Sequence, residues 1–363
     1  MKIRKALESF KPYQWEPSTR EIARSVGLPE RRIVRMDANT SPFIPSTSLK
    51  RLASKIESFR VNDYPDTSYH DLAAALSRYT GKDPNRLVVT NGADEALDIV
   101  SKVYLDPSDE AVIPYPTYSM FRIVTEIIGA KPVLAKRNSD LSLNMSEIKR
   151  KINERTRVVF LCSPNNPTGD SISAETAREI VESTDALVVI DEAYYEFSGK
   201  TLADLTDEYD NLAIIRTFSK AFSMAGVRVG YIISSEHTVE SFNLVRPPNS
   251  LGVISLALAQ FALEDRKSME RNVRSIMNER KRCYDLMNEL PGIEVYPGEA
   301  NFVLFKVKNG RAKDVNMHLL KKGFVLRDFS DSAGLEGCLR VTIGTKQDND
   351  AFLKNLKSAL VPR

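Results

Sequence analysis

Short apolar runs alternate with helix-like stretches from about residue 87 to residue 233. This alternation predicts parallel strands that are joined by crossover helices. The expected strands are Leu87 to Thr90, Ala111 to Ile113, Val158 to Cys162, Leu187 to Asp191, Leu212 to Thr217 and Val229 to Ile233. Each run is followed by a polar or glycine-containing turn, where a doubly wound sheet binds its ligands. We therefore expect an α/β fold with a site at these strand ends.

The pattern changes after a loop at residues 246–250. A helical stretch from Ser255 to about Leu290 is followed by further strand-like and helix-like segments, namely Asn301 to Val307, Ala312 to Lys322 and Leu339 to Ile343. A chain of 363 residues also exceeds the size at which a single core stops growing. We therefore expect a second, smaller α+β domain. The last residues, 360–363, are similar to the remnant of a cleaved tag and are set apart from the fold.

Composition and charge narrow the function classes. A net charge of +3 is too small and too evenly spread to indicate binding to nucleic acid or to a membrane surface. Three isolated cysteines form no C-x-x-C pair, which favours a reducing cytoplasm. Only three histidines are present and none lies at ligand spacing, so we expect no metal site.

The stretch from Thr217 to Gly230 places a lysine between hydroxyls on a small-residue loop after an apolar run. It resembles the segment S-K-x-x-x-x-x-G-x-R-x-G of the pyridoxal-phosphate (PLP) aminotransferases of fold type I. The matching residues are Ser219, Lys220, Gly226, Arg228 and Gly230. The resemblance implies that Lys220 binds PLP covalently and that Thr217 and Ser219 lie at the cofactor. It also implies a large domain with a mostly parallel seven-stranded sheet flanked by helices, and a smaller α+β domain.

In this family the N-terminal segment belongs partly to the small domain. The resemblance thus implies an N-terminal arm and part of the small domain in residues 1–55, a large PLP-binding domain in 56–255 and a small domain in 256–359.

A carboxylate ends the apolar strand Leu187 to Asp191. Such a buried charge is costly unless a cation meets it, and the pyridinium nitrogen of PLP is such a cation. Tyr194 matches the family tyrosine that bonds the phenolic oxygen of PLP. By itself, the sequence Asp-Glu-Ala-Tyr could also be a helix N-cap. Asn166 lies in a turn that resembles the family loop N-P-x-N-P-T-G, with Ser163 in place of its first asparagine, and takes the position that donates to the same oxygen.

A strand also turns at Gly92 and then opens a helix. The first N–H groups of a helix, with its positive dipole end, can bind phosphate. We assign Gly92, Ala93 and Asp94, together with Ser219 and Arg228, to the cofactor phosphate. Asp94 could alternatively cap its own helix.

Two tyrosines complete the implied cofactor site. Tyr118 matches the aromatic residue that stacks on the pyridine ring in relatives. Tyr64, in a Y-P-D segment, matches the tyrosine that reaches the phosphate of the neighbouring subunit's cofactor. The resemblance therefore implies a homodimer.

The resemblance is strongest to the histidinol-phosphate aminotransferases, on Tyr13, Arg327 and Arg340. Two arginines suit a phosphate, because guanidinium groups bind it bidentately. The implied reaction is a ping-pong transamination between histidinol phosphate and imidazole acetol phosphate, with glutamate and 2-oxoglutarate as the second pair. Lys220 would be the general base. Asn39 begins the segment Asn-Thr-Ser-Pro, where relatives have N-E-N-P, and this departure weakens the assignment of the substrate contacts.

Other functions fit the same motifs. An aromatic or broad-specificity aminotransferase would need only Arg340 for a carboxylate, and a phosphothreonine decarboxylase could use the same scaffold. A non-catalytic ligand sensor is disfavoured because the catalytic set is intact and no appended DNA-binding helix pair is present.

Overall fold

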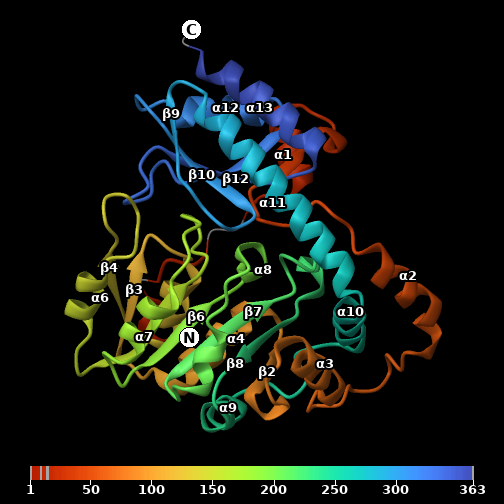
Figure 1. The fold of residues 1–363 in the computed structure, drawn as a ribbon, viewed down its shortest axis with the longest axis vertical. Coiled ribbons are helices and arrows are strands. Elements are labelled where there is room, and N and C mark those ends of the chain that lie inside the picture. Colours follow the sequence, from red (N-terminus) through yellow and green to blue (C-terminus); the bar gives the residue numbers. More distant parts are fainter. Residues whose placement is uncertain (1, 9, 14–15, 362–363) are drawn as a thin grey trace.

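The computed structural model describes residues 2–8, 10–13 and 16–361. The described residues form two sheets, one above the other in Figure 1, with helices around each. The predicted α/β class is therefore confirmed.

The larger sheet has seven strands in the described part of the chain. Across the sheet they are β2 (Leu87–Thr90), β8 (Gly230–Ile233), β7 (Leu212–Thr217), β6 (Leu187–Asp191), β5 (Thr156–Cys162), β3 (Glu110–Tyr115) and β4 (Lys131–Lys136). The strands from β7 to β4 are parallel, whereas β8 runs antiparallel to both of its neighbours. The predicted mostly parallel seven-stranded sheet is confirmed.

Helices cover both faces of this sheet, which is why its central strands are continuous apolar runs. They are α3 (His70–Thr80), α4 (Gly92–Tyr104), α5 (Met120–Ile128), α6 (Met145–Lys151), α7 (Ala174–Val181), α8 (Tyr195–Ser198), α9 (Glu236–Asn243) and α10 (Val253–Glu264). Successive side chains of a strand enter opposite cores: Val159 and Leu161 belong to one buried cluster, and Val158 and Phe160 to the other.

The run-based prediction missed β4. Its exposed lysines, half-buried Val133 and exposed Leu134 do not form a buried apolar run, because β4 is an edge strand with one neighbour. An edge strand needs less apolar surface than a central one, so periodicity alone does not reveal it.

The smaller sheet has five strands within the described residues. In order they are β1 (Val34–Met36), β11 (Phe324–Asp328), β12 (Cys338–Thr342), β10 (Phe302–Val307) and β9 (Ile293–Val295). The N-terminal strand β1 pairs in parallel with β11, so the beginning of the chain joins this second sheet. The sequence analysis identified β10 and β12 but not β1, β9 and β11.

The helices near the smaller sheet also depart in part from the prediction. They are α1 (Thr19–Val26), α11 (Arg266–Asn288), α12 (Ala312–Lys321) and α13 (Lys346–Leu360). Helix α2 (Ser46–Lys55) follows β1 in the sequence. The expected helix from 255 to 290 is two helices, α10 and α11, that meet at Asp265. In Figure 1, α11 runs from the level of the larger sheet to that of the smaller one.

The end of the chain is partly structured. Leu360 is the last residue of α13 and packs against the main buried cluster. Pro362 and Arg363, which belong to the predicted tag remnant, lie outside the described residues. The predicted domain boundaries stay predictions. In the part of the chain that the structure describes, no helix has the length and apolarity needed to cross a membrane.

Candidate active site

A cavity of about 670 Å³ lies where the carboxyl ends of β5, β6 and β7 face the smaller sheet. All of the predicted site residues line it except Gly92 and Tyr64. The predicted residues in its wall are Tyr13, Asn39, Ala93, Asp94, Tyr118, Asn166, Asp191, Tyr194, Thr217, Ser219, Lys220, Arg228, Arg327 and Arg340. Side chains far apart in the sequence therefore meet in one place.

Asp191 ends β6 and is 3% exposed. One of its oxygens accepts a hydrogen bond from the backbone N–H of Ala193, at 2.9 Å. Burial raises the pKa of this carboxyl to about 7, against the opposing effect of that N–H group. None of the described residues forms an ion pair with it. The helix-cap alternative holds only for Tyr194, which is the N-cap of α8 but makes no side-chain cap hydrogen bond, whereas Asp191 does not cap this helix.

Lys220 lies on the loop after β7, as predicted. Its Nζ donates to the carbonyl oxygen of Ala38, at 3.0 Å, and lies 5.8 Å from the ring centre of Tyr194. Burial and, to a smaller extent, the positive charge of Arg340 lower the pKa of this amine to about 8. At physiological pH a substantial fraction of the lysine is therefore the neutral amine, although the ammonium form still predominates.

Helix α4 begins at Gly92, which has a left-handed φ of 77°, and Ala93 and Asp94 of its first turn line the cavity. A Cβ on Gly92 would lie 2.6 Å from Nη2 of Arg228, so the close approach of this guanidinium requires glycine. Asp94 does not cap its helix, which corrects that alternative. Its carboxylate instead accepts from the hydroxyl of Tyr118, at 2.9 Å, and from Arg228, at 3.1 Å.

The hydroxyl of Thr217 donates to that of Ser219, at 3.0 Å, on the same side of the cavity as Arg228. Backbone N–H groups, two hydroxyls and a guanidinium form a set of donors that suits a phosphate.

Asn39 connects the N-terminal part of the chain to this site. Its side-chain amide donates to the hydroxyl of Tyr194, at 2.9 Å, and its backbone carbonyl accepts from Asn301, at 3.0 Å. Burial raises the pKa of Tyr194 above its usual value. In the divergent segment, the hydroxyl of Ser41 accepts from that of Ser223, at 2.7 Å. The segment therefore contacts the loop that carries Lys220.

Arg327 and Arg340 lie directly opposite each other on the antiparallel strands β11 and β12. Arg340 donates to the side-chain oxygen of Asn166 and to the backbone carbonyl of Asp37, and its Nε is buried without a hydrogen bond. Burial lowers the pKa of Arg340 to about 10, and the charge of Arg327 adds to this effect. Two neighbouring guanidinium groups of like charge, with an unused donor, suit an anionic ligand.

Sequence reasoning missed Glu16, which lines the cavity and contacts Arg327. It also missed Asn165, which holds the loop before Asn166 through bonds with Thr117 and Thr168, at 2.6 and 2.7 Å. The two successive asparagines of the loop were a visible signal for Asn165, whereas no motif distinguished Glu16. Tyr64 is 86% exposed and lies outside the cavity of its own chain.

Comparisons with known proteins agree with this geometry. Residues 31–356 match the model of the family Aminotransferase class I and II. The chain is 36% identical to the histidinol-phosphate aminotransferase of Caldanaerobacter subterraneus subsp. tengcongensis, over 99% of this chain and 98% of that protein. It is also 36% identical to the protein of the same name from Methanocaldococcus jannaschii, over 99% and 98% of the two chains.

A solved structure has a similar fold. It is histidinol-phosphate aminotransferase from Sinorhizobium meliloti in complex with pyridoxal-5'-phosphate, with a TM-score of 0.89, 23% identity and coverage of 99% of this chain and 97% of that one. The family that the motifs predicted is confirmed. The chain belongs to the class I and II aminotransferases.

Proposed function

We propose that this protein is a PLP-dependent histidinol-phosphate aminotransferase, which interconverts histidinol phosphate and imidazole acetol phosphate with glutamate and 2-oxoglutarate as the second pair. Two full-length relatives at 36% identity carry that name. The observation that carries the proposal is the facing pair Arg327 and Arg340, at the end of the cavity that holds Lys220 and Asp191.

The cavity fits PLP. When bound, this cofactor supplies an aldehyde that bonds to amines and a ring that accepts electrons from the neighbouring carbon. Asp191, buried without an ion pair among the described residues, would face the ring nitrogen as a counter-charge. Tyr194 and Asn166 would donate to the ring hydroxyl, and Tyr118 would stack on the ring face.

The phosphate of the cofactor would lie at the beginning of α4. The N–H groups of Gly92, Ala93 and Asp94 would donate to it, together with Thr217, Ser219 and Arg228. Arg228 now pairs with Asp94, at 3.1 Å, and its remaining N–H donors are available to a phosphate.

Lys220 would anchor the cofactor and then move the proton. A base is most effective when its pKa lies near the working pH, and the pKa of Lys220 is lowered to about 8. A neutral amine at this position can accept a proton from the substrate carbon. The ammonium formed in this way can donate the proton again in a later step. The bond to Ala38 holds the amine in the cavity meanwhile.

Arg327 and Arg340 would bind the phosphate of histidinol phosphate, and Tyr13 and Asn39 would lie beside the substrate. The same arginines would take a carboxylate of glutamate. A phosphate with three acceptor oxygens matches two guanidinium forks better than one carboxylate does.

A substrate panel tests this proposal. We expect purified, PLP-loaded protein to prefer histidinol phosphate over phenylalanine, tyrosine and aspartate as amino donor to 2-oxoglutarate. A preference for aromatic amino acids would replace the proposal by a broad aminotransferase. Release of carbon dioxide from phosphothreonine, without transamination, would replace it by a decarboxylase.

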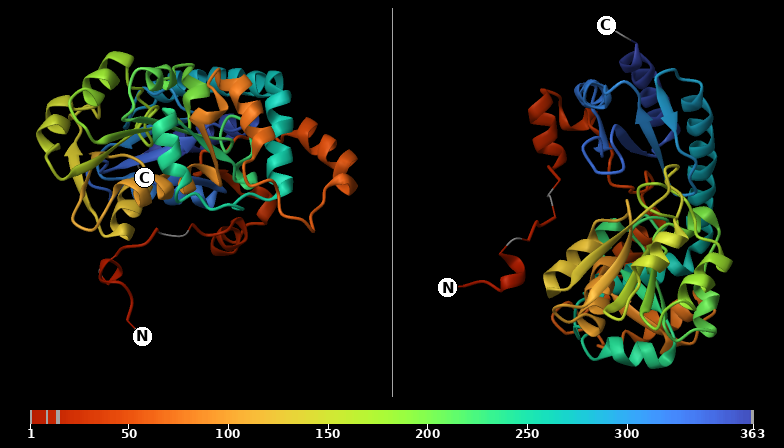
Figure 2. Two further views of the ribbon diagram at one scale, coloured as in Figure 1. Left: turned by 90° about the horizontal axis from the view of Figure 1, so that it is seen from below. Right: turned by 90° about the vertical axis from the view of Figure 1, so that its left-hand side faces the viewer.

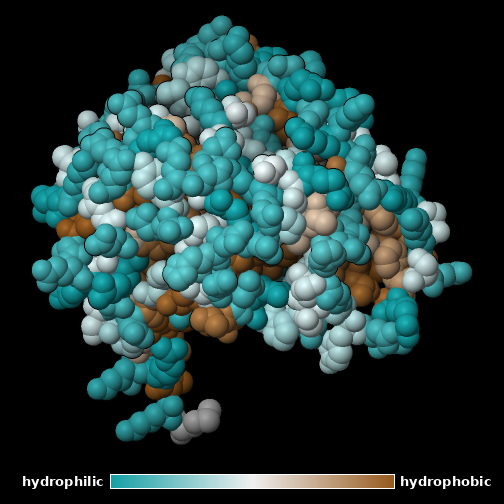
Figure 3. All heavy atoms as spheres, turned by 60° about the horizontal axis from the view of Figure 1, so that its bottom comes forward, coloured by the Kyte–Doolittle hydropathy of each residue, from teal (hydrophilic) through white to brown (hydrophobic). Residues whose placement is uncertain are grey.

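We also infer a homodimer in which Tyr64 serves the neighbouring subunit's cofactor phosphate. Large apolar side chains of the same stretch of chain are also exposed, with Ile44 at 72% and Val61 at 70%. Apolar patches interrupt the hydrophilic surface on the face drawn in Figure 3. A subunit interface would cover exposed apolar side chains of this kind. The three cysteines are buried and free, which is consistent with a reducing cytoplasm as its location.

Hybrid dimers test the role of Tyr64. In a hybrid of a Lys220→Ala subunit with a Tyr64→Phe subunit, the site that keeps Lys220 would receive an intact Tyr64. In a hybrid of wild type with the double variant, that site would receive the altered residue. We expect the first hybrid to be the more active. An active monomer in analytical ultracentrifugation would contradict the arrangement.

A further inference from the structure

The N-terminal segment passes beside the cavity as an arm. In Figure 2 it runs along one side of the molecule, from α1 near the smaller sheet towards the larger one. Its far part is fixed at α5, where Arg4 donates to the carbonyl of Ile128, at 2.9 Å. Its near part supplies Pro12, Tyr13 and Glu16 to the cavity wall. The arm thus places an acidic side chain at the anion-binding end of the cavity.

Glu16 forms an ion pair with Arg327. One of its carboxylate oxygens accepts from Nη1 of Arg327 and also from the hydroxyl of Tyr13, at 3.2 Å. The other oxygen lies 3.7 Å from Arg35. The side chains of Glu16 and Arg327 are 28% and 31% exposed, so the pair lies at the cavity rim, where it can open without a large rearrangement.

The charges near this rim can be counted. Arg35 forms a two-point ion pair with Asp37, at 2.8 and 2.7 Å, so those two charges cancel. Asp328 also carries a negative charge, but it accepts from Asn316, at 3.0 Å, and from the backbone of Ser330, and among the described residues it forms no ion pair with either arginine.

Arg340 contacts only uncharged acceptors, among the described residues. With Glu16 in place, the facing arginines therefore carry one uncompensated positive charge. With Glu16 displaced, they carry two.

We propose that Glu16 is a specificity-determining residue that lets one arginine pair accept anions of two different charges. This inference rests on the proposed function, in which the pair takes both a carboxylate and a phosphate. A carboxylate, with one negative charge, matches the pair while Glu16 stays on Arg327. A phosphate monoester, with a charge near −2, is repelled by Glu16 and matches the pair once Glu16 has left.

The ion pair between Glu16 and Arg327 opposes the binding of a phosphate but not that of a monocarboxylate. Binding of a phosphate breaks the ion pair between Glu16 and Arg327, whereas binding of a monocarboxylate leaves it intact. Glu16 thus weakens phosphate binding selectively and keeps the two substrates closer in affinity than the bare arginine pair would.

Glu16→Gln tests the inference in the PLP-loaded protein, where the cofactor phosphate site is already filled. The probes are inorganic phosphate at a pH where it is dianionic, and acetate, each titrated by calorimetry. We expect phosphate to bind about tenfold more tightly in the variant, because no charge-assisted bond has to be broken. The affinity for acetate should change by less than about threefold, because the pair remains available to one charge.

Two controls separate this effect from a general one. Glu30→Gln removes an exposed carboxylate that lies 3.8 Å from Arg20, and it should change neither affinity. In an Arg327→Ala background, Glu16→Gln should have a much smaller effect on phosphate binding, because no ion pair with Arg327 is left to break. Glu16→Ala repeats the test without an amide that could still bond to Arg327.

Weaker or unchanged phosphate binding in both Glu16 variants, or an effect of undiminished size in the Arg327→Ala background, would overturn the inference. In turnover, Glu16→Gln should lower KM for histidinol phosphate and leave KM for glutamate nearly unchanged. If histidinol phosphate is not a substrate and the phosphate titration still gives the expected change, the proposed function fails and the charge selection by Glu16 stands.

Discussion

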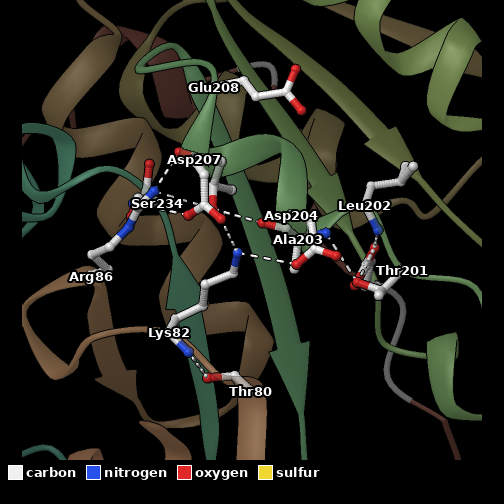
Figure 4. Close-up of polar contacts among 12 residues, drawn as sticks. Thr80, Lys82, Arg86, Thr201, Leu202, Ala203, Asp204, Asp207, Glu208 and Ser234 are labelled. Atoms are coloured by element: carbon white, nitrogen blue, oxygen red, sulfur yellow. Dashed lines mark hydrogen bonds and ion pairs between the residues drawn. The ribbon is translucent and has the colours of Figure 1, made fainter.

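Two lysines of this molecule are held in opposite ways. Lys82, after α3, has a side chain that is only 6% exposed, and its ammonium lies 2.7 Å from Asp207 and 3.1 Å from Asp204. Figure 4 shows these carboxylates, which belong to the short helix η5 (Ala203–Asp207), on either side of the ammonium, with Arg86 also bonded to Asp207. Lys220 has no carboxylate partner among the described residues and bonds to one backbone carbonyl.

The difference separates a structural charge from a reactive one. Lys82 forms ion pairs with two carboxylates and so links α3 to η5. Without such partners, burial favours the neutral amine, and the pKa of Lys220 falls to about 8. Asp191 is also buried without an ion-pair partner among the described residues. Burial therefore favours its neutral form too, and its pKa rises to about 7. Buried charges without partners, gathered in a cavity, are typical of functional sites.

Replacement of Lys220 or of Lys82 by alanine, one at a time, should give the largest difference in turnover between two variants. We expect Lys220→Ala to lower turnover by roughly 10⁴-fold or more, because the covalent anchor and the base are lost together. Lys82→Ala should change kcat by less than about twofold, as a substitution far from the cavity. Borohydride reduction followed by peptide mapping should find the cofactor on Lys220 alone. Labelling of another lysine would contradict the assignment.

Asp191→Asn removes the second unpaired charge. Loss of one partner of a buried ion pair typically costs about 3 to 5 kcal/mol, so we expect turnover to fall by two to three orders of magnitude. Single-turnover kinetics of each half-reaction would measure this. Near-normal rates would show that Asp191 does not face the ring nitrogen.

Asp191→Asn also gives a prediction for the stability of the protein without PLP, because it removes a buried charge that has no partner. The folded-state pKa of Asp191 is about 7 and the unfolded value is about 4, so the folded protein binds more protons between these values. The contribution of Asp191 to the stability of the apoprotein is therefore expected to fall as pH rises from about 4 to 7. Denaturant titrations should find apo Asp191→Asn more stable than apo wild type above about pH 7, and similar to it near pH 4.

The sequence alone located most of this site because its residues follow recognisable strands. The runs of β6 and β7 are buried on both faces, so their ends, and with them Asp191 and Lys220, could be placed from periodicity and motif. The contact between Glu16 and Arg327 could not, because it joins positions 311 residues apart through the pairing of β1 with β11. Neither strand is a long apolar run. The partners of Asp94 were missed for the same reason, since Tyr118 and Arg228 come from other elements.

Arg327→Ala is expected to have a smaller effect than the loss of Asp191. A charge-assisted bond to phosphate contributes about 1.5 to 3 kcal/mol, so kcat/KM for histidinol phosphate should fall ten- to a hundredfold or somewhat more. Phenylalanine, which needs one arginine for its carboxylate, should be affected much less. Equal damage to both substrates would mean that the arginine pair does not recognise phosphate.

The smallest expected effect concerns stability. Lys82→Met replaces the paired ammonium by an apolar side chain of similar length, while Asp204 and Asp207 remain largely exposed to water, which can solvate them. We expect the free energy of unfolding to fall by about 1 to 2 kcal/mol, with kcat unchanged.

Lys220→Met is the matched control in the apoprotein. The folded-state pKa of Lys220, about 8, lies below the unfolded value of about 10.4, so burial of its charge disfavours folding at pH values below about 8. Lys220→Met should therefore leave the apoprotein at pH 7 as stable as wild type or more stable. If this variant loses more stability than Lys82→Met, then Lys220 is the better compensated of the two charges, and the contrast between a structural and a reactive lysine is wrong.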